Sequence, residues 1–176
     1  MNEIEVKFAV DSFDAIRARV ESAGFSSGGM FTERVRYYDS LDRKWASAGV
    51  TIRTKTVNGR TVVTVKKKVA GEYKSSVEKE CEVIDPKNEL EGMLSILGLR
   101  TDLEYTKQRE HFTSLGLGAV ELDSVEEIGA KYIELETESE EKMSELIKEL
   151  AVDGATQDMR SYPNIIREFR NIAPTT

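Results

Sequence analysis

The sequence predicts an α+β fold in which a mostly antiparallel sheet is flanked by helices. Eight segments alternate apolar and polar residues, as strands with two different faces do, and four others have apolar residues at helical spacing. The predicted order, β-α-ββββ-α-βββ-α-α, lacks the strict strand–helix alternation of a doubly wound parallel sheet. The 176 residues contain no long linker or repeat, so we expect one domain spanning residues 1–176.

The predicted helices are amphipathic and have recognisable ends. They span residues 13–23, 86–97, 140–151 and about 162–169. Asp85 and Ser139 stand where the second and third helices begin, and Asp and Ser are favoured N-cap residues because their side chains accept a hydrogen bond from a free backbone N–H. The apolar side of each helix is expected to pack on the sheet.

The predicted strands fill most of the remaining chain. They span residues 2–9, 34–39, 50–57, 61–69, 76–84, 103–113, 118–125 and 130–138. Asn58-Gly59 separates the third from the fourth, and Asn-Gly is typical of a tight hairpin turn because both residues accept a positive φ.

Charged residues recur at every second position of seven of these strands, so they share one face of each strand. In most strands these charges have the same sign, as in the pair Lys107 and Arg109 or the pair Glu134 and Glu136. Solvent-exposed sheet faces are commonly polar, which is the simplest interpretation. Exposed faces usually mix both signs, however, and a sheet curled into a closed barrel would collect these charges in its interior. Such an interior suits a cation bound to a polyphosphate, since carboxylates bind hard cations and basic groups bind phosphate oxygens.

Composition excludes several classes of protein. The net charge is −7 and the pI is about 5.0, which argues against a nucleic-acid binder or a membrane-surface binder. No apolar run reaches membrane-spanning length and the N-terminus has no leader-like pattern, so we expect a cytoplasmic protein. His111, the single histidine, has no Ser or Cys partner in an evident pattern and is expected to have a surface or packing role.

The charged strands also resemble those of a known family, in order and in spacing. The matching segments are Glu3-Ile4-Glu5-Val6-Lys7, Tyr37-Tyr38-Asp39, Gly49 to Lys55, Thr64-Val65-Lys66, Glu78-Lys79-Glu80, Lys107-Gln108-Arg109, Asp123 to Glu136, and Ser161-Tyr162. Together they resemble the CYTH superfamily of triphosphate tunnel metalloenzymes, and the last segment is similar to CyaB-like members. Two positions depart from the family pattern: Glu33 and Val35 replace a Gln-x-Asp, and Ser75-Ser76 stands where an Arg is frequent.

The resemblance implies an eight-stranded antiparallel closed β-barrel whose charged tunnel holds a triphosphate. It implies Mg²⁺ or Mn²⁺ bound by Glu3, Glu5, Asp123, Glu134 and Glu136. It implies phosphate binding by Arg53, Lys55, Lys66, Lys107 and Arg109, and it makes Lys7 the group that orients or activates the nucleophile. Glu78 and Glu80 are expected to be further acids of the tunnel, without an assigned role.

Two activities remain open on the sequence alone. An adenylyl cyclase would convert ATP to cyclic AMP and pyrophosphate, whereas a triphosphatase would release orthophosphate from ATP or another triphosphate. A module that binds polyphosphate or nucleotide without catalysis is a third alternative. The expected partner is a small triphosphate molecule rather than nucleic acid or membrane, and a homodimer is compatible with the family.

Overall fold

The computed structural model describes residues 2–69, 74–85, 87, 89–152 and 154–172, with the side chains of residues 2, 3, 74 and 75 outside that description. Its strands are β1 (Asn2–Val10), β2 (Ser26–Asp39), β3 (Val50–Val57), β4 (Arg60–Val69), β5 (Lys74–Val83), β6 (Arg100–Ser114), β7 (Gly118–Val125), β8 (Ala130–Thr137) and β9 (Thr156–Gln157). Its helices are α1 (Asp14–Ser22), α2 (Lys44–Ser47), α3 (Leu90–Ile96), α4 (Glu140–Glu149) and α5 (Tyr162–Phe169), with a 3₁₀ turn, η1, at Glu126–Ile128.

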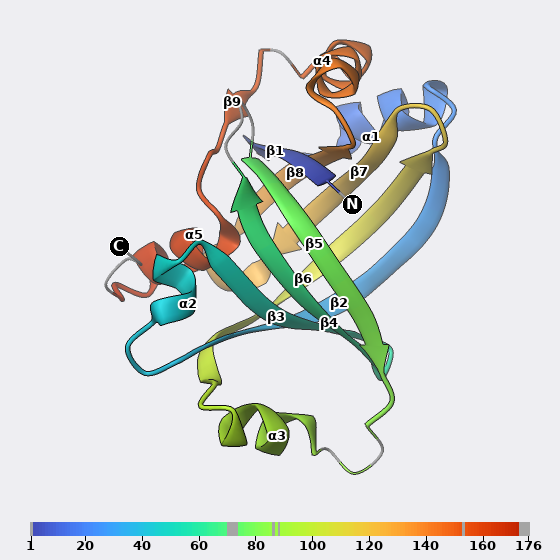
Figure 1. Cartoon of the computed structure of the whole chain (residues 1–176). Coiled ribbons are helices and arrows are strands. Elements are labelled where there is room, and N and C mark those ends of the chain that lie inside the picture. Colours follow the sequence, from blue (N-terminus) through green and yellow to red (C-terminus); the bar gives the residue numbers. More distant parts are fainter. Residues whose placement is uncertain (1, 70–73, 86, 88, 153, 173–176) are drawn as a thin grey trace.

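The strands form one antiparallel sheet that is strongly curled (Figure 1). Its order is β5-β4-β3-β2-β6-β7-β8-β1-β9, and β1 also pairs with β5 at four register positions, from Asn2 to Glu5. The α+β antiparallel prediction is therefore confirmed. The sheet has nine strands rather than eight, because the two-residue β9 pairs with β1 along the edge of β1 that does not pair with β8.

Most predicted elements agree with the structure to within a few residues. β3 and β7 have the predicted bounds, and the Asn58-Gly59 turn has positive φ at both residues. The largest difference is β2, which begins at Ser26 rather than at residue 34. Its first residues, Ser26 to Met30, look like a loop in sequence, but they pair with β6 across a register shift in which Gly29 takes φ +87°.

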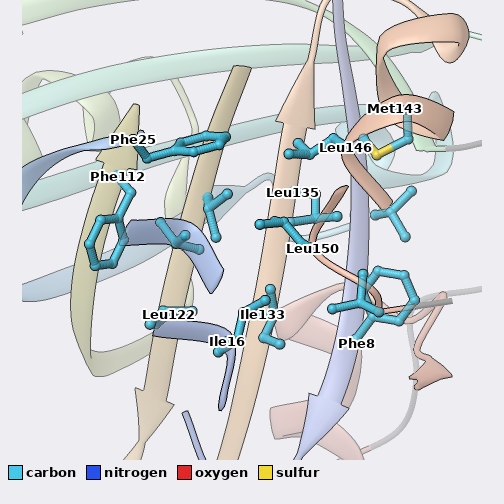
Figure 2. Packing of buried hydrophobic residues seen from close by; sticks show 14 of the residues in the cluster. Phe8, Ile16, Phe25, Phe112, Leu122, Ile133, Leu135, Met143, Leu146 and Leu150 are labelled. Atoms are coloured by element: carbon cyan, nitrogen blue, oxygen red, sulfur yellow. The ribbon is translucent and has the colours of Figure 1, made fainter. Parts of the chain in front are cut away.

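The main hydrophobic core lies between the outer face of the sheet and helices α1 and α4. Alternate residues of β1, β6, β7 and β8 point into it, including Phe8, Phe112 and Leu135 (Figure 2). Ile16 from α1 and Leu146 from α4 pack against them. These helices thus cover the outer face of one half of the sheet.

A second, smaller core lies on the inner face and fixes α5 there. Tyr162, Ile165 and Ile166 of α5 pack with Val35 and Tyr105 of the sheet. On these strands the inner-core residues have the same parity as the charged site residues predicted from the sequence, for example Tyr105 and Lys107. The helix therefore packs on the inner face of the curled sheet.

Helix α3 and the outer face of β4 and β5 contribute little to either core. The predicted amphipathic helix at 86–97 is shorter in the structure and has no buried residue, and Leu97 is 75% exposed. Val65 of β4 and Cys81 of β5 are likewise exposed. No helix in the described part of the chain has the length and apolar character needed to cross a membrane.

The contrast between α4 and α3 gives a stability prediction. Leu146 is fully buried in the main core, so Leu146→Ala should lower the free energy of unfolding by about 2–5 kcal/mol through the cavity it leaves. The same change at the exposed Leu97 should stay within about 0.5 kcal/mol of the unsubstituted protein. Urea unfolding of the two variants measures the difference, and equal losses would contradict the assignment of the core to the α1–α4 side.

Candidate active site

A cavity of about 620 Å³ lies within the curl of the sheet and is lined by all eight long strands together with the first residues of α5. The structure brings the five predicted phosphate-binding residues together on its wall: Arg53, Lys55, Lys66, Lys107 and Arg109. Three predicted metal ligands also line it: Glu5, Glu134 and Glu136. The inner face of the sheet is thus the charged face that alternation predicts.

Asp123 is at the centre of the charged network. It is fully buried and accepts hydrogen bonds from Lys107 Nζ at 2.7 Å, from Arg109 Nε and Nη2 at 2.6 Å each, and from the Tyr162 hydroxyl at 2.8 Å. Arg109 Nη2 also donates to Glu134 at 2.6 Å. These contacts join β6, β7, β8 and α5 through charged groups that are almost entirely removed from water.

Burial and neighbouring charges move the carboxyl pKa values in opposite directions. Burial alone would raise the pKa of Asp123, but the positive charges of Arg109 and Lys107 lower it below its usual range. For Glu134, burial and then repulsion by Glu5 raise the pKa to about 7, against the opposing effect of Lys107. The pKa values of two neighbouring carboxyls are therefore shifted in opposite directions, because Asp123 has the stronger cationic contacts.

The wall formed by β3, β4 and β5 pairs cations with acids as well. Lys55 Nζ lies 3.2 Å from Glu80 Oε1, and Lys66 forms an ion pair with Glu78. Arg53 differs, since its buried Nε has no hydrogen-bond partner in the described part of the chain. A buried guanidinium N–H that lacks an acceptor fits an anionic ligand in the cavity.

The predicted metal ligands divide into three groups. Glu5 and Glu136 face each other across β1 and β8 and line the cavity with Glu134, whereas Asp123 is held by the cations described above. Glu3 lies in β1, but its side chain is outside the described residues. Among the residues that are described, no three His, Cys, Asp or Glu side chains converge as a metal site. The carboxylate donors nonetheless have the chemistry that hard divalent cations prefer.

Lys7 lies in the wall behind the cavity lining. Only 1% of it is exposed, and its Nζ donates to the backbone carbonyl of Arg160. The Nζ also lies 4.7 Å from the ring centroid of Tyr162 and 5.6 Å from that of Tyr132. The ammonium is thus enclosed between β1, β8 and the segment that leads into α5.

Many other lining residues are absent from the predicted set, among them Glu33, Tyr37, Lys68, His111 and Glu121. Glu33 is 5% exposed and lies 3.4 Å from Lys107 Nζ. Burial raises the pKa of Glu33, but the positive charges of Lys107 and Arg109 lower it by more than burial raises it. The net shift of this pKa is therefore downward. The sequence could have indicated that Glu33 faces the cavity, because the period-two pattern of β2 continues upstream of residue 34.

His111 is the clearest departure from expectation. It was expected to be a surface or packing residue, but it lines the cavity and its Nδ1 lies 2.7 Å from Glu121 Oε1. The two residues are direct cross-strand neighbours of β6 and β7. The sequence does not show which residues of two neighbouring strands lie opposite each other. Nothing near His111 in the sequence therefore indicated Glu121 as its partner.

The pairing gives a pH prediction. The hydrogen bond to Glu121 raises the pKa of His111 above 6.5. The charged imidazole therefore contributes stability that is complete below pH 6.5 and is lost as the pH rises through the folded-state pKa. The single histidine should give one NMR titration with a midpoint above 6.5, and Glu121→Gln should lower that midpoint. Unfolding measurements should show a larger loss from Glu121→Gln at pH 6 than at pH 9, and an equal loss at both would contradict the pairing.

Known proteins share this fold and sequence pattern. The CYTH domain family matches residues 1–162. A solved protein of Pyrococcus horikoshii OT3 is 27% identical with a TM-score of 0.77, covering 96% of this chain and 99% of its own. A proposed adenylate cyclase of Vibrio parahaemolyticus is 19% identical with a TM-score of 0.71, covering 93% of this chain and 97% of its own.

A third structure is that of HpAC1 from Hippeastrum, a proposed adenylyl cyclase described as having a dominant triphosphatase activity. It is 20% identical with a TM-score of 0.70, and the match covers 97% of each chain. None of the curated proteins matches this sequence. With the CYTH domain spanning residues 1–162 and the curled antiparallel sheet that surrounds a charged cavity, the chain belongs to the CYTH family.

Proposed function

We propose that this protein is an enzyme that hydrolyses a triphosphate within a tunnel formed by its sheet. The observation that carries the proposal is the cavity wall, on which the five predicted phosphate-binding side chains, from three strands, and carboxylates from several other strands face one cavity. The pairing of β1 with β5 supports closure of the sheet into a tunnel, because it connects the two ends of an eight-strand run.

The chain's cations account for substrate binding in this proposal. Arg53, Lys55 and Lys66 on β3 and β4, with Lys107 and Arg109 on β6, bind the phosphate oxygens and neutralise charge as it develops. Phosphoryl transfer needs mainly positioning and electrostatic stabilisation from a protein, since little covalent chemistry is required. Arg53 supports this role most directly, because its Nε lacks an acceptor among the described residues.

The acidic residues are proposed to hold Mg²⁺ or Mn²⁺. Glu5, Glu134 and Glu136 would bind it, with Glu3 and Asp123 completing the set that the family resemblance implies. Repulsion between Glu5 and Glu134 contributes to the raised pKa of Glu134, and a divalent cation bound by both carboxylates would relieve that repulsion. When bound, the metal would polarise the phosphate and offset its charge.

Adenylyl cyclase activity is the second candidate, favoured by a different part of the lining. Near α2 and the start of α5 the lining includes the uncharged Ala46, Ile52 and Pro163, and the charged Arg43 and Asp102 there are paired with each other. This end fits an organic group better than a phosphate, so ATP could bind with its base there. The structural likeness to proposed adenylate cyclases is consistent with this alternative, and a binding module without catalysis would have the same wall.

Phosphorus-31 NMR separates these activities. With Mg²⁺ or Mn²⁺ present, we expect orthophosphate from tripolyphosphate or ATP, loss of activity on chelation, and recovery when the metal is returned. Glu136→Gln should abolish turnover, whereas Glu145→Gln, on the exposed side of α4, should not. Pyrophosphate together with a cyclic phosphate would establish the cyclase instead. Binding without any product would contradict an enzymatic function.

A second test isolates the phosphate site from catalysis. Arg53→Ala should weaken tripolyphosphate binding by about 1.5–3 kcal/mol, roughly 10- to 150-fold in Kd, because a charged hydrogen-bond donor is lost. Arg60→Ala is the matched control, since that side chain is 80% exposed and lies outside the cavity lining. Isothermal titration calorimetry measures both, and an unchanged Kd for Arg53→Ala would contradict the proposed phosphate site.

A further inference from the structure

His111 lies in a row of residues that runs across the sheet at the level of the proposed metal site. It faces Glu121 on β7, Glu121 faces Glu134 on β8, and Glu134 faces Lys7 on β1. Adjacent strands lie about 4.8 Å apart, so the backbones at His111 and Glu134 are separated by roughly 10 Å. Both side chains line the cavity. His111 is therefore at the same level along the strands as Glu134, a carboxyl of the proposed metal site.

Two contacts hold the imidazole ring in place. On one side, Nδ1 lies 2.7 Å from Glu121 Oε1. On the other, the ring lies over Gly28 of β2, where an added Cβ would come within 2.7 Å of His111 Cδ2. The position thus needs a residue without a side chain at 28. Nε2 is left without a protein partner in the described part of the chain.

The arrangement gives Nε2 a definite chemical character. A carboxylate that accepts a hydrogen bond from Nδ1–H favours the neutral tautomer in which Nδ1 keeps its proton and Nε2 carries a lone pair. Lys55, Lys66 and Lys107, by contrast, each form an ion pair with a carboxylate of the wall. Lys7 is buried behind the wall and donates to a backbone carbonyl. Compared with these four lysines, His111 is therefore the better base to accept a proton within the cavity.

We propose that His111 is the general base of the hydrolysis and that Glu121 is its positioning residue. Nε2 removes a proton from the attacking water, and the water oxygen forms a bond to the terminal phosphorus. The bond between that phosphorus and the bridging oxygen breaks, and the bridging oxygen leaves with the electron pair as part of the diphosphate product. The imidazolium then returns its proton to solvent. This inference rests on the proposed triphosphatase function.

The groups around the ring determine the expected pH dependence. Glu121 faces it from β7, Arg109 precedes it on β6 and Lys55 acts from β3, while β2 contributes only Gly28 and Gly29. The hydrogen bond to Glu121 is the largest effect and raises the pKa of His111 above 6.5. Because the base acts when neutral, kcat should rise with pH through a midpoint above 6.5 and then level off.

The main test compares His111→Gln with the unsubstituted protein, using tripolyphosphate and metal over a range of pH. We expect kcat to fall about 100- to 10,000-fold, with little change in KM, and the acidic limb of the pH profile to disappear. The Kd for tripolyphosphate, measured by calorimetry, should stay within about threefold because the phosphate-binding cations are intact. Glu110→Gln is the matched control, since Glu110 lies on the opposite face of β6 and pairs with Arg17.

Two further variants separate proton transfer from folding. Added imidazole should partly restore the activity of His111→Ala, which a structural defect would not allow. Gly28→Ala keeps the histidine but displaces its ring, so it should lower kcat and reduce the pKa measured by NMR while KM is retained. These variants also keep the proposal testable if His111→Gln does not fold.

The outcomes distinguish this inference from the function on which it rests. If the unsubstituted protein releases orthophosphate and the His111 and Gly28 variants keep its kcat and acidic limb, the general base is elsewhere and the triphosphatase proposal still stands. If the unsubstituted protein binds tripolyphosphate, ATP and other triphosphates without releasing orthophosphate, both proposals are overturned. A selective fall in kcat with imidazole rescue supports both.

Discussion

The buried carboxylate of Asp123 is the interaction on which the inner wall depends. It accepts hydrogen bonds from Lys107, Arg109 and Tyr162, so one side chain on β7 connects β6 with α5. Moving such charges out of water costs several kcal/mol per ion unless each finds close partners. Asp123 meets this condition because its cations lie directly beside it and a hydroxyl adds a further donor. The closest cations in the cavity are thereby fixed in place before any ligand binds.

Residue alternation explains how the same strands carry a hydrophobic core and a charged cavity. In β6 and β7, Phe112 and Leu122 point outward to α1 and α4, while Arg109 and Asp123 point inward. A register slip of one residue would exchange these faces, placing charges in the core and apolar groups in the cavity. The outer core thus fixes the register, and the register fixes which charges meet.

This dependence on register separates what the sequence could predict from what it could not. Strand positions and the charged face follow from local period-two patterns, and Asn58-Gly59 marks its hairpin by its own φ preference. The partners of each charge do not follow, because they come from strands distant in sequence, as His111 and Glu121 do. The apolar pattern at residues 86–97 correctly indicated a helix but not its exposure, since nothing local says whether another element will cover it.

The cavity wall also implies that anion and cation binding are coupled. Lys55, Lys66 and Arg109 already contact the carboxylates Glu80, Glu78 and Glu134. A polyphosphate that binds these cations must therefore replace carboxylates that neutralise them, and the displaced Glu78 and Glu134, with side chains only 9% and 6% exposed, are left poorly solvated. A divalent cation that binds the displaced carboxylates offsets this desolvation cost. The negative charge of the polyphosphate in turn offsets the cost of placing the divalent cation in the cavity. By thermodynamic linkage each should then bind more tightly in the presence of the other. The protein's own ion pairs thus favour a metal–polyphosphate complex over either component alone.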